Sequence, residues 1–162
     1  MKNNLLKIYS FIINFMEETI PSIAILLIIL VLIVQVFMRT VFRISYTSLY
    51  ELSLWGYVWL LYFGASYARR KDKHVRLDII YEKFPTKVQK GLNIFFNLFV
   101  TVVFVILLPD IWEYLMFVSR IKTHTLRWSW TYVFSPFFIF MVLVIIHNLE
   151  YIYKDLKYIL DN

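Results

Sequence analysis

The sequence has no cysteine among its 162 residues. Disulfides, thiol catalysis, thiolate metal sites and iron–sulfur clusters are therefore excluded, since each needs cysteine. Long polar segments are also missing: the longest stretch between apolar blocks, residues 69–90, is too short to fold as a soluble domain. We therefore expect no soluble catalytic or ligand-binding domain, so that function must reside among the apolar segments or in a partner.

Apolar residues dominate what is present. The chain is 60% hydrophobic and 20% aromatic, well outside the composition of an average soluble domain. These residues cluster in long blocks, which indicates a bilayer environment rather than a water-soluble core. The formal net charge of +6 is then expected to reflect membrane orientation, and we expect membrane lipids but no nucleic acid among the partners.

Four of the apolar blocks are long enough to span a hydrocarbon core, which takes about 20 apolar residues of helix. The predicted fold class is an all-α membrane protein with a single domain, residues 1–162. Its four expected transmembrane helices cover residues 20–42, 49–68, 91–118 and 131–147.

The first segment, residues 1–19, has the pattern of an amphipathic helix that lies in the membrane interface. Its polar side chains recur at steps of four and three residues and form one stripe: Asn3, Lys7, Ser10, Asn14 and Glu17. The segment is a poor match to a signal peptide, because Glu17 and Glu18 interrupt the apolar run. Residues 148–162 have a similar pattern and are interpreted as a cytoplasmic tail.

The distribution of lysine and arginine predicts which side of the membrane each connection faces. Of the 17 basic residues, two lie in residues 1–19, eight in residues 69–90 and two in residues 148–162. The remaining five are Arg39, Arg43, Arg120, Lys122 and Arg127. The larger group marks the cytoplasmic side, so both termini and the 69–90 connection are predicted to be cytoplasmic.

Glu51 opens the second apolar block and faces Arg39 and Arg43 across a short connection. One interpretation makes it a proton or cation site. The other makes it a structural group that pairs with Arg39 to fix the first helical hairpin, or that faces a partner. We favour the second, because two guanidinium groups would keep the carboxylate ionised, whereas a proton carrier must exchange its proton near neutral pH.

The second apolar block carries small residues on one helical face, Gly56, Gly64 and Ala68, with Trp55 and Trp59 on the remaining circumference. Small residues at this spacing allow another helix to approach closely. A cofactor box is the alternative, and a packing surface of aromatic rings around a glycine notch is the interpretation we favour.

The third apolar block contains a polar line, Asn93, Asn97 and Thr101, spaced by four residues. Such residues usually face a neighbouring helix, and three of them on one helix do not make an ion pathway. Further along the block, Pro109 is expected to produce a kink or a break, with Asp110 in a wetter segment.

The three histidines are His74, His124 and His147, and none lies near the predicted membrane midplane. A haem held in a helical bundle needs opposed histidines inside it, and no two of these histidines have helical metal-ligand spacing. We therefore expect no haem, no metal and no other cofactor. A membrane enzyme or a haem-binding redox subunit is kept as a rival function.

The connection at residues 69–90 is the most charged part of the chain. Its cluster from Arg69 to Lys73 is interpreted as a cytoplasmic anchor held by lipid head groups. His74 and Asp78 lie one turn apart on a short predicted interfacial helix that ends at Pro85, within hydrogen-bonding range of each other. We interpret this pair as a structural clasp at a subunit or lipid interface.

Taken in order, these features resemble the DctQ-type small membrane subunit of the tripartite ATP-independent periplasmic (TRAP) transporters. A first helix that ends in "VFMRTVF" is followed by "YELSLWGYVWLLYFGASYARRKDKHVRLDIIYEKFP". The resemblance covers residues 20–147, with one departure, Ser129 where the family often has a proline before the tryptophan of the last helix. The residues that match the family's pattern are Arg39, Glu51, Trp59, Gly64, His74, Asp78 and Pro85.

The resemblance implies an accessory subunit without catalytic activity, multi-pass in the bacterial inner (cytoplasmic) membrane. It implies two protein partners: a large permease subunit that imports an organic acid with a sodium gradient, and a periplasmic substrate-binding protein that delivers the solute. The residues then expected at subunit interfaces or in structural roles are Arg39, Glu51, Trp55, Trp59, Gly64, His74 and Asp78. The rival function is an autonomous small proton-coupled transporter or channel with Glu51 as its coupling carboxylate.

Overall fold

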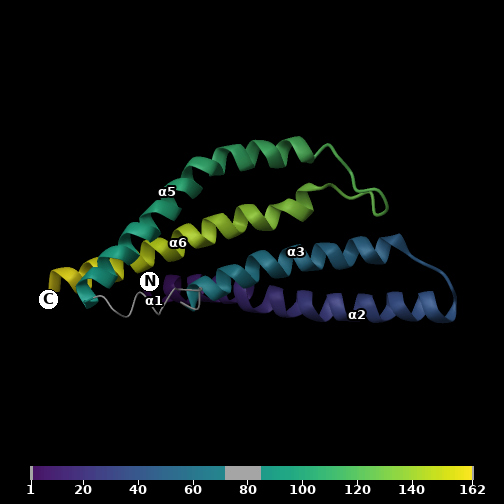
Figure 1. The fold of residues 1–162 in the computed structure, drawn as a ribbon, viewed down its shortest axis with the longest axis horizontal. Coiled ribbons are helices and arrows are strands. Elements are labelled where there is room, and N and C mark those ends of the chain that lie inside the picture. The colour runs from purple at the N-terminus through teal and green to yellow at the C-terminus, as the bar shows by residue number, and fades with distance from the viewer. Residues whose placement is uncertain (1, 72–84, 162) are drawn as a thin grey trace.

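In the computed structural model, which describes residues 2–71 and 85–161, the chain folds into helices joined by short connections (Figure 1). The elements are, in order, α1 (Lys2–Asn14), the π-helical turn η1 (Phe15–Thr19), α2 (Ile20–Val41), α3 (Thr47–Arg70), α5 (Thr86–Val118) and α6 (Thr131–Asp161). Extended pairing in this part of the chain is limited to one isolated bridge between Lys122 and Ser129. The predicted all-α class is confirmed.

The four long helices lie side by side as a single layer, in the order α2, α3, α6 and α5 (Figure 1). Contacts among the described residues concentrate on neighbours in that order, α2 on α3, α3 on α6 and α6 on α5. α3 and α6 therefore hold the two central positions. We call the end of the layer that contains Arg69 and Arg70 the inner end, and the end that contains the connections 42–46 and 119–130 the outer end.

Three of the described helical segments are long and apolar enough to cross a membrane: Lys7–Val41, Thr86–Val118 and Thr131–Leu160. They coincide with the first predicted span up to residue 41 and contain the third and fourth, although α6 continues past residue 147 without a break. α3 has 24 residues, enough to cross at about 1.5 Å per residue, but tyrosine, tryptophan and serine side chains lower its mean hydropathy. Its assignment as a membrane span therefore stays a prediction.

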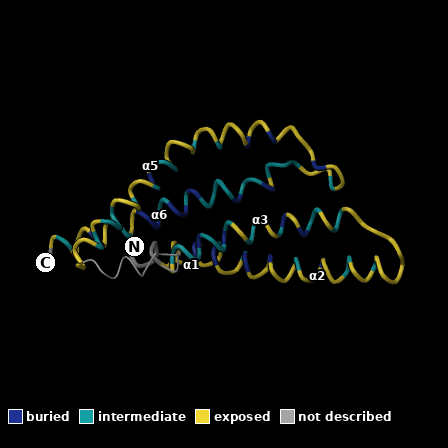
Figure 2. Tube along the Cα trace, in the orientation of Figure 1, coloured by how far each residue is buried: buried dark blue, intermediate teal, exposed yellow. Residues whose placement is uncertain are grey.

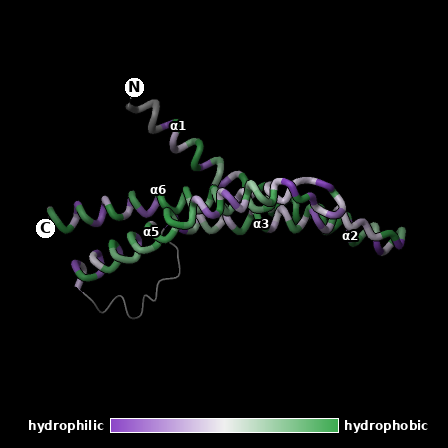
Figure 3. Tube along the Cα trace, turned by 90° about the horizontal axis from the view of Figure 1, so that it is seen from above, coloured by the Kyte–Doolittle hydropathy of each residue, from purple (hydrophilic) through white to green (hydrophobic). Residues whose placement is uncertain are grey.

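α1, η1 and α2 follow one another without a connecting loop. The π turn is marked by a hydrogen bond from the N–H of Ile20 to the carbonyl oxygen of Phe15, one residue longer than the α-helical pattern. At this turn α1 leaves the layer (Figure 3). Ile8 and Phe11 are exposed on α1 whereas Ile13 is buried, so one apolar face of α1 is open and another packs inward.

The core lies between α3, α6 and the N-terminal segment. Phe63 and Met141 are only 1% and 0% exposed, and Phe63 packs with Ile13 and Leu143. The outward surfaces of α2 and α5 are mostly exposed (Figure 2) and carry large apolar side chains. Apolar surface of this extent is expected to contact lipid or another subunit rather than water.

α5 contains Pro109 and changes direction along its length (Figure 1). Proline has no N–H to donate, and its ring clashes with the carbonyl group four residues earlier, so it bends a helix that neighbouring contacts keep intact. The helix accordingly continues through Pro109 to Val118 with a bend, the first of the two outcomes expected there.

Candidate functional sites at the two ends of helix α3

The inner end holds a buried carboxylate, Glu17, which is 1% exposed. Its Oε1 accepts a hydrogen bond from Oγ of Ser66 at 2.7 Å and lies 2.6 Å from Nε2 of His147. The predicted polar stripe of residues 1–19 would turn Glu17 toward the membrane surface. It lies against α3 and α6 instead, and Asn14, its neighbour in the stripe, also contacts Arg70 of α3.

Arg70 connects this carboxylate to the N-terminal segment. Its Nε lies 3.0 Å from Oε2 of Glu17, an ion pair whose direction does not meet hydrogen-bond geometry. Its terminal nitrogens donate to Oε1 of Glu18 at 2.6 Å and to Oδ1 of Asn14 at 2.7 Å. Arg70 thereby fixes the junction of α1 and η1 against the last turn of α3.

Arg69 forms a second polar node, directed toward α5 and α6. Its Nε and Nη2 donate to Oδ1 of Asn148 at 2.9 and 2.8 Å, and Nη2 also donates to Oδ1 of Asn97. Nδ2 of Asn148 donates in turn to Oγ1 of Thr101 at 3.2 Å. Asn97 and Thr101, two members of the predicted polar line, therefore face α6, and Arg69 joins them to α3.

The interpretation of the Arg69–Lys73 cluster as a lipid anchor missed these structural roles. The guanidinium of Arg69 also lies over the ring of Tyr151 at 5.0 Å, and that of Arg70 over the ring of Tyr67 at 5.6 Å. The hydroxyl of Tyr151 donates to the carbonyl oxygen of Arg70 at 2.7 Å. The side chains that accept hydrogen bonds from both arginines come from segments far apart in the sequence, which a local charge pattern cannot indicate.

The outer end holds the other carboxylate of the site, Glu51. Its Oε1 accepts a hydrogen bond from the N–H of Thr125 at 3.0 Å, and its Oε2 accepts one from the N–H of Leu126 at 2.9 Å. Both amides belong to the connection at residues 119–130, which we call the outer hairpin. In it the N–H of Thr123 donates to the carbonyl oxygen of Trp128 at 2.8 Å, so Glu51 holds the tip of a closed turn.

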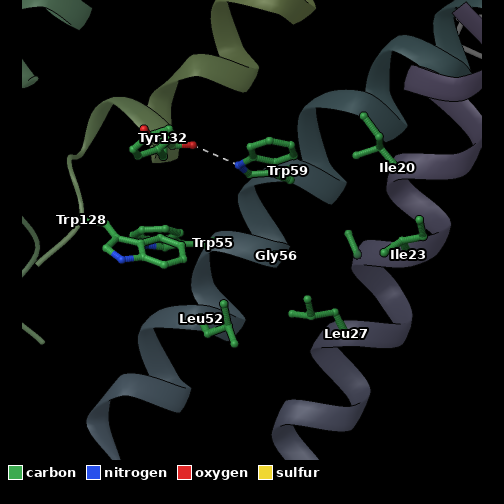
Figure 4. A pocket seen from close by; sticks show the side chains of 10 residues that line it. Ile20, Ile23, Leu27, Leu52, Trp55, Gly56, Trp59, Trp128 and Tyr132 are labelled. Atoms are coloured by element: carbon green, nitrogen blue, oxygen red, sulfur yellow. Dashed lines mark hydrogen bonds between the residues drawn. The ribbon is translucent and has the colours of Figure 1, made fainter. Parts of the chain in front are cut away.

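Trp55 and Trp59 lie on the same face of α3 as Glu51, because these three residues follow one another at intervals of four positions. Trp55 packs against Trp128 with ring centroids 5.1 Å apart, and Nε1 of Trp59 donates to the carbonyl oxygen of Tyr132 at 3.1 Å (Figure 4). Glu51, Trp55 and Trp59 thus form one row that attaches α3 to the outer hairpin and to the start of α6.

An apolar cavity of about 610 Å³ lies beside this row (Figure 4). Its walls come from α2, α3, the outer hairpin and the start of α6: Ile20, Ile23, Ala24, Leu27, Leu52, Trp55, Gly56, Trp59, Trp128 and Tyr132. No acidic, basic or histidine side chain is among them. The cavity therefore offers apolar contact rather than acid–base or ion-binding chemistry.

The predicted glycine notch separates into two different environments. At Gly56 an added Cβ would lie 2.9 Å from Cγ1 of Ile28, so α2 and α3 approach each other closely at this glycine. At Gly64 an added Cβ would meet no described atom within 4 Å. Gly56 therefore serves packing within the chain, and Gly64 leaves a gap on the surface of α3.

The remaining predicted site residues are not brought into the row. Arg39 is exposed in the last turn of α2. In the described part of the chain it does not form the expected ion pair with Glu51, because the Glu51 carboxylate binds the hairpin amides instead. His74 and Asp78 lie outside the described residues.

Two functional residues that the sequence interpretation did not select are Glu17 and His147. An acidic residue and a histidine beside long apolar runs are a signal for a buried polar contact. The pairing itself could not be predicted, because 130 positions separate the two residues.

Chemically, both ends of α3 hold helices together. Within the described parts of the chain, no three histidine, cysteine or acidic side chains gather as metal ligands. The two carboxylates, Glu17 and Glu51, are each bound by hydrogen-bond donors of the chain itself. The hydrogen bonds of both carboxylates therefore join α3 to other elements of the chain.

Comparison with protein-family models finds a match over residues 28–157 to the family described as "Tripartite ATP-independent periplasmic transporters, DctQ component". The match spans most of the chain and includes the whole row on α3 and the contacts of Arg69, whereas the N-terminal partners of Arg70 lie before it. Comparison with curated proteins finds no match. The chain belongs to the DctQ family, the small membrane component of TRAP transporters.

Proposed function

We propose that this chain is a non-catalytic accessory subunit that supports the large permease subunit of a TRAP transporter. In this proposal the large subunit moves an organic acid with a sodium gradient, and a periplasmic substrate-binding protein delivers the solute. Membership of the DctQ family supports the transporter context. Ion coupling and solute recognition are assigned to the partners, because Glu17 and Glu51 are engaged in contacts within the chain.

The proposal includes four membrane spans, with both termini on the cytoplasmic side of a bacterial inner membrane. α3 packs between α2 and α6, which belong to candidate spans, so a helix of its length is expected to cross beside them. The excess of lysine and arginine in residues 1–19, 69–90 and 148–162 supports a cytoplasmic inner end. Cysteine-accessibility labelling at introduced cysteines in the two ends tests this orientation.

The observation that carries the proposal is that polar contacts lie inside the helical layer, whereas large apolar side chains cover its outer surface. The polar side chains of the inner end bind one another, whereas α2 and α5 expose large apolar side chains along their lengths, among them Leu26, Leu30, Phe96, Phe99 and Ile106. A single layer of helices leaves broad apolar faces to which a second membrane subunit can bind. This is the arrangement expected of a scaffold.

Co-purification tests the proposal. An affinity-tagged chain, expressed with the permease subunit encoded beside it, is expected to retain that subunit in mild detergent at a constant ratio. Liposomes that contain both subunits, supplied with the binding protein and a sodium gradient, are expected to accumulate an organic acid. Failure to retain any multispan subunit would refute the scaffold role.

The rival function, in which Glu51 couples protons to transport, makes a different prediction for the same liposomes. Both oxygens of Glu51 already accept hydrogen bonds from backbone amides, which is the environment of a structural acceptor. Solute uptake by liposomes that contain this chain alone would favour the rival, and its absence together with uptake by the full assembly would favour the scaffold.

A further inference from the structure

We propose that the apolar cavity beside the row on α3 binds one acyl chain of a membrane phospholipid, whose phosphate group lies at the cations of the outer hairpin. The inference goes beyond the proposed function, because it assigns a ligand to this chain itself. It uses the membrane placement of α3 from that proposal, but it does not depend on the transport role or on the protein partners.

The cavity exists because the two indole rings of the row are held away from α2. Trp55 packs against Trp128 of the outer hairpin, and Trp59 donates its N–H to the carbonyl oxygen of Tyr132 (Figure 4). Both rings are therefore directed toward the outer hairpin and the start of α6, and the space between them and α2 stays open. The contacts that attach α3 to the hairpin thus also shape the cavity.

The cavity has a buried floor and an open rim. Ala24 and Trp55 are buried at the floor, whereas Ile23, Trp128 and Tyr132 are each more than half exposed at the rim. Because α2 belongs to a candidate membrane span, the rim opens toward the hydrocarbon region of the bilayer in the proposed membrane placement. Lipid chains fill that region, so they are the molecules that reach the rim.

Water does not suit the chemistry of this cavity. A buried water molecule needs about two to four polar partners, and apolar cavities stay dry. The lining contains no charged or amide side chain, and its one hydroxyl belongs to the rim residue Tyr132. The N–H of Trp59 is already bound to a carbonyl oxygen. An empty space would leave the lining without contact atoms on one side, so an apolar occupant is favoured.

The size of the cavity favours a single hydrocarbon chain over a helix of another subunit. An apolar cavity of about 150 Å³ holds one molecule of benzene, so the volume of about 610 Å³ holds on the order of twenty carbon atoms. One fatty acyl chain has about this size. A membrane-spanning helix is about 10 Å wide and 30 Å long, which is several times the volume of the cavity. A helix can therefore lie across the rim but cannot enter.

Cations of the outer hairpin lie beside the cavity and match the phosphate group of such a lipid. Arg127 directly precedes the lining residue Trp128, and Lys122 lies opposite Ser129 across the hairpin. Both cations are exposed, and neither pairs with an acidic side chain in the described part of the chain. Lysine and arginine near a membrane surface attract anionic head groups. A phospholipid therefore fits both the apolar cavity and the charge beside it.

A photoreactive lipid tests the site. The full-length chain, purified with any subunit that it retains, is placed in nanodiscs of phosphatidylcholine that contain phosphatidylglycerol with a diazirine in one acyl chain. After irradiation, the modified residues are mapped by mass spectrometry. Labelling is expected at the floor of the cavity, on Ala24 and Trp55, which are buried and which lipid around the outside of the layer does not reach.

Variants that fill the cavity provide the comparison. Leu52→Trp enlarges a lining residue, and the control Leu54→Trp places the same side chain at an exposed position of α3 outside the lining. The first variant is expected to lose most of the labelling on Trp55, and the control is expected to keep it. Ala24→Phe fills the floor and replaces Leu52→Trp if that variant does not fold. Equal labelling of Trp55 in the wild type and in a folded, filled variant would overturn the inference.

The phosphate contact is tested by Arg127→Gln, with Lys157→Gln at an exposed position of the inner end as its control. Loss of one cation beside the head group is expected to lower labelling of Trp55 about fivefold, and the control is expected to stay within about twofold of the wild type. Unchanged labelling in Arg127→Gln would overturn the assignment of the phosphate to the hairpin.

The outcomes also separate this inference from the proposed function. If a permease subunit is retained but the floor of the cavity is not labelled in the wild type, a helix covers the rim, and the lipid site is refuted while the scaffold role stands. Labelling of the floor in a chain that retains no multispan subunit would support the lipid site and refute the scaffold role.

Discussion

Replacing Glu17 by alanine removes the acceptor shared by Ser66 and His147 and the anion beside Arg70. Hydrogen bonds to a charged group contribute about 1.5–3 kcal/mol each. Removing one member of a fully buried ion pair costs about 3–5 kcal/mol. The lower part of these ranges applies, because the Arg70 side chain is 20% exposed and keeps its pair with Glu18. We expect a loss of about 3 kcal/mol in the free energy of unfolding, a factor on the order of a hundred.

The matched control is Glu18→Ala, one residue further along the same turn. The side chain of Glu18 is 45% exposed and makes one ion pair with Arg70. Exposed pairs of this kind contribute about 0–1 kcal/mol. Both variants carry the same loss of charge and the same change in helix propensity, so the difference between them isolates the buried contacts of Glu17.

The assay is reversible unfolding of the purified chain in mixed micelles, titrated with dodecyl sulfate and followed by tryptophan fluorescence. The Glu17 variant is expected to unfold at a lower detergent fraction than the Glu18 variant, with an unchanged slope. If the free energies of unfolding of the two variants differ by less than about 0.5 kcal/mol, the buried cluster does not stabilise the fold and the reasoning fails.

Three further variants probe the row and the glycines of α3. Gly56→Leu places side-chain atoms where Ile28 already lies within 2.9 Å, and overpacking should lower stability by about 1–3 kcal/mol in the same titration; an unchanged midpoint would contradict the close approach. Gly64→Leu should leave the isolated chain within about 0.5 kcal/mol of the wild type but reduce the permease subunit retained on purification, and full retention would remove this position from the interface. Glu51→Ala should let trypsin cut after Arg127 about tenfold faster while the unfolding midpoint stays constant; equal cutting rates would show that the carboxylate does not hold the hairpin.

The positions of the helices could be predicted from the sequence because apolar length is a direct physical requirement of a bilayer. The first span was expected at residues 20–42 and α2 covers Ile20–Val41. The fourth was expected to begin at residue 131, where α6 begins. Connections were harder to place. α5 begins at Thr86, within the segment predicted as a polar connection, because the helix extends beyond the membrane core into the interface and starts only after Pro85.

The candidate site was predictable only as far as helical spacing reaches. The sequence interpretation selected Glu51, Trp55 and Trp59 separately, without grouping them as one row, and it could not show that the outer hairpin covers their face of α3. For Glu51 it suggested an arginine as partner, and the structure supplies backbone amides. Amides of a loop leave no mark in a sequence, since every residue other than proline carries one.

The inner end was missed for a different reason. Arg69 and Arg70 sit in a run of charge that a membrane surface alone would explain, and their partners include Asn148 in another helix. A sequence shows the cost of burying such groups but not the neighbours that compensate it. Glu17 was expected at the membrane surface because its partners, Ser66 and His147, belong to other helices, which spacing within residues 1–19 cannot reveal.

The π turn at residues 15–19 also makes the direction of α1 depend on a single position in the chain. Each residue of an α-helix advances the side chains by about 100° around the axis, so the additional residue of this turn rotates everything before Phe15 by that angle relative to α2. Deleting Thr19 would return the segment to an ordinary α-helix and turn the open apolar face of α1, with Ile8 and Phe11, by a quarter of a circle or more. The number of residues between Ile13 and Pro21 therefore determines the rotation of α1 relative to α2. Inserting or deleting one residue there would reorient the whole of α1 without altering any of its side chains.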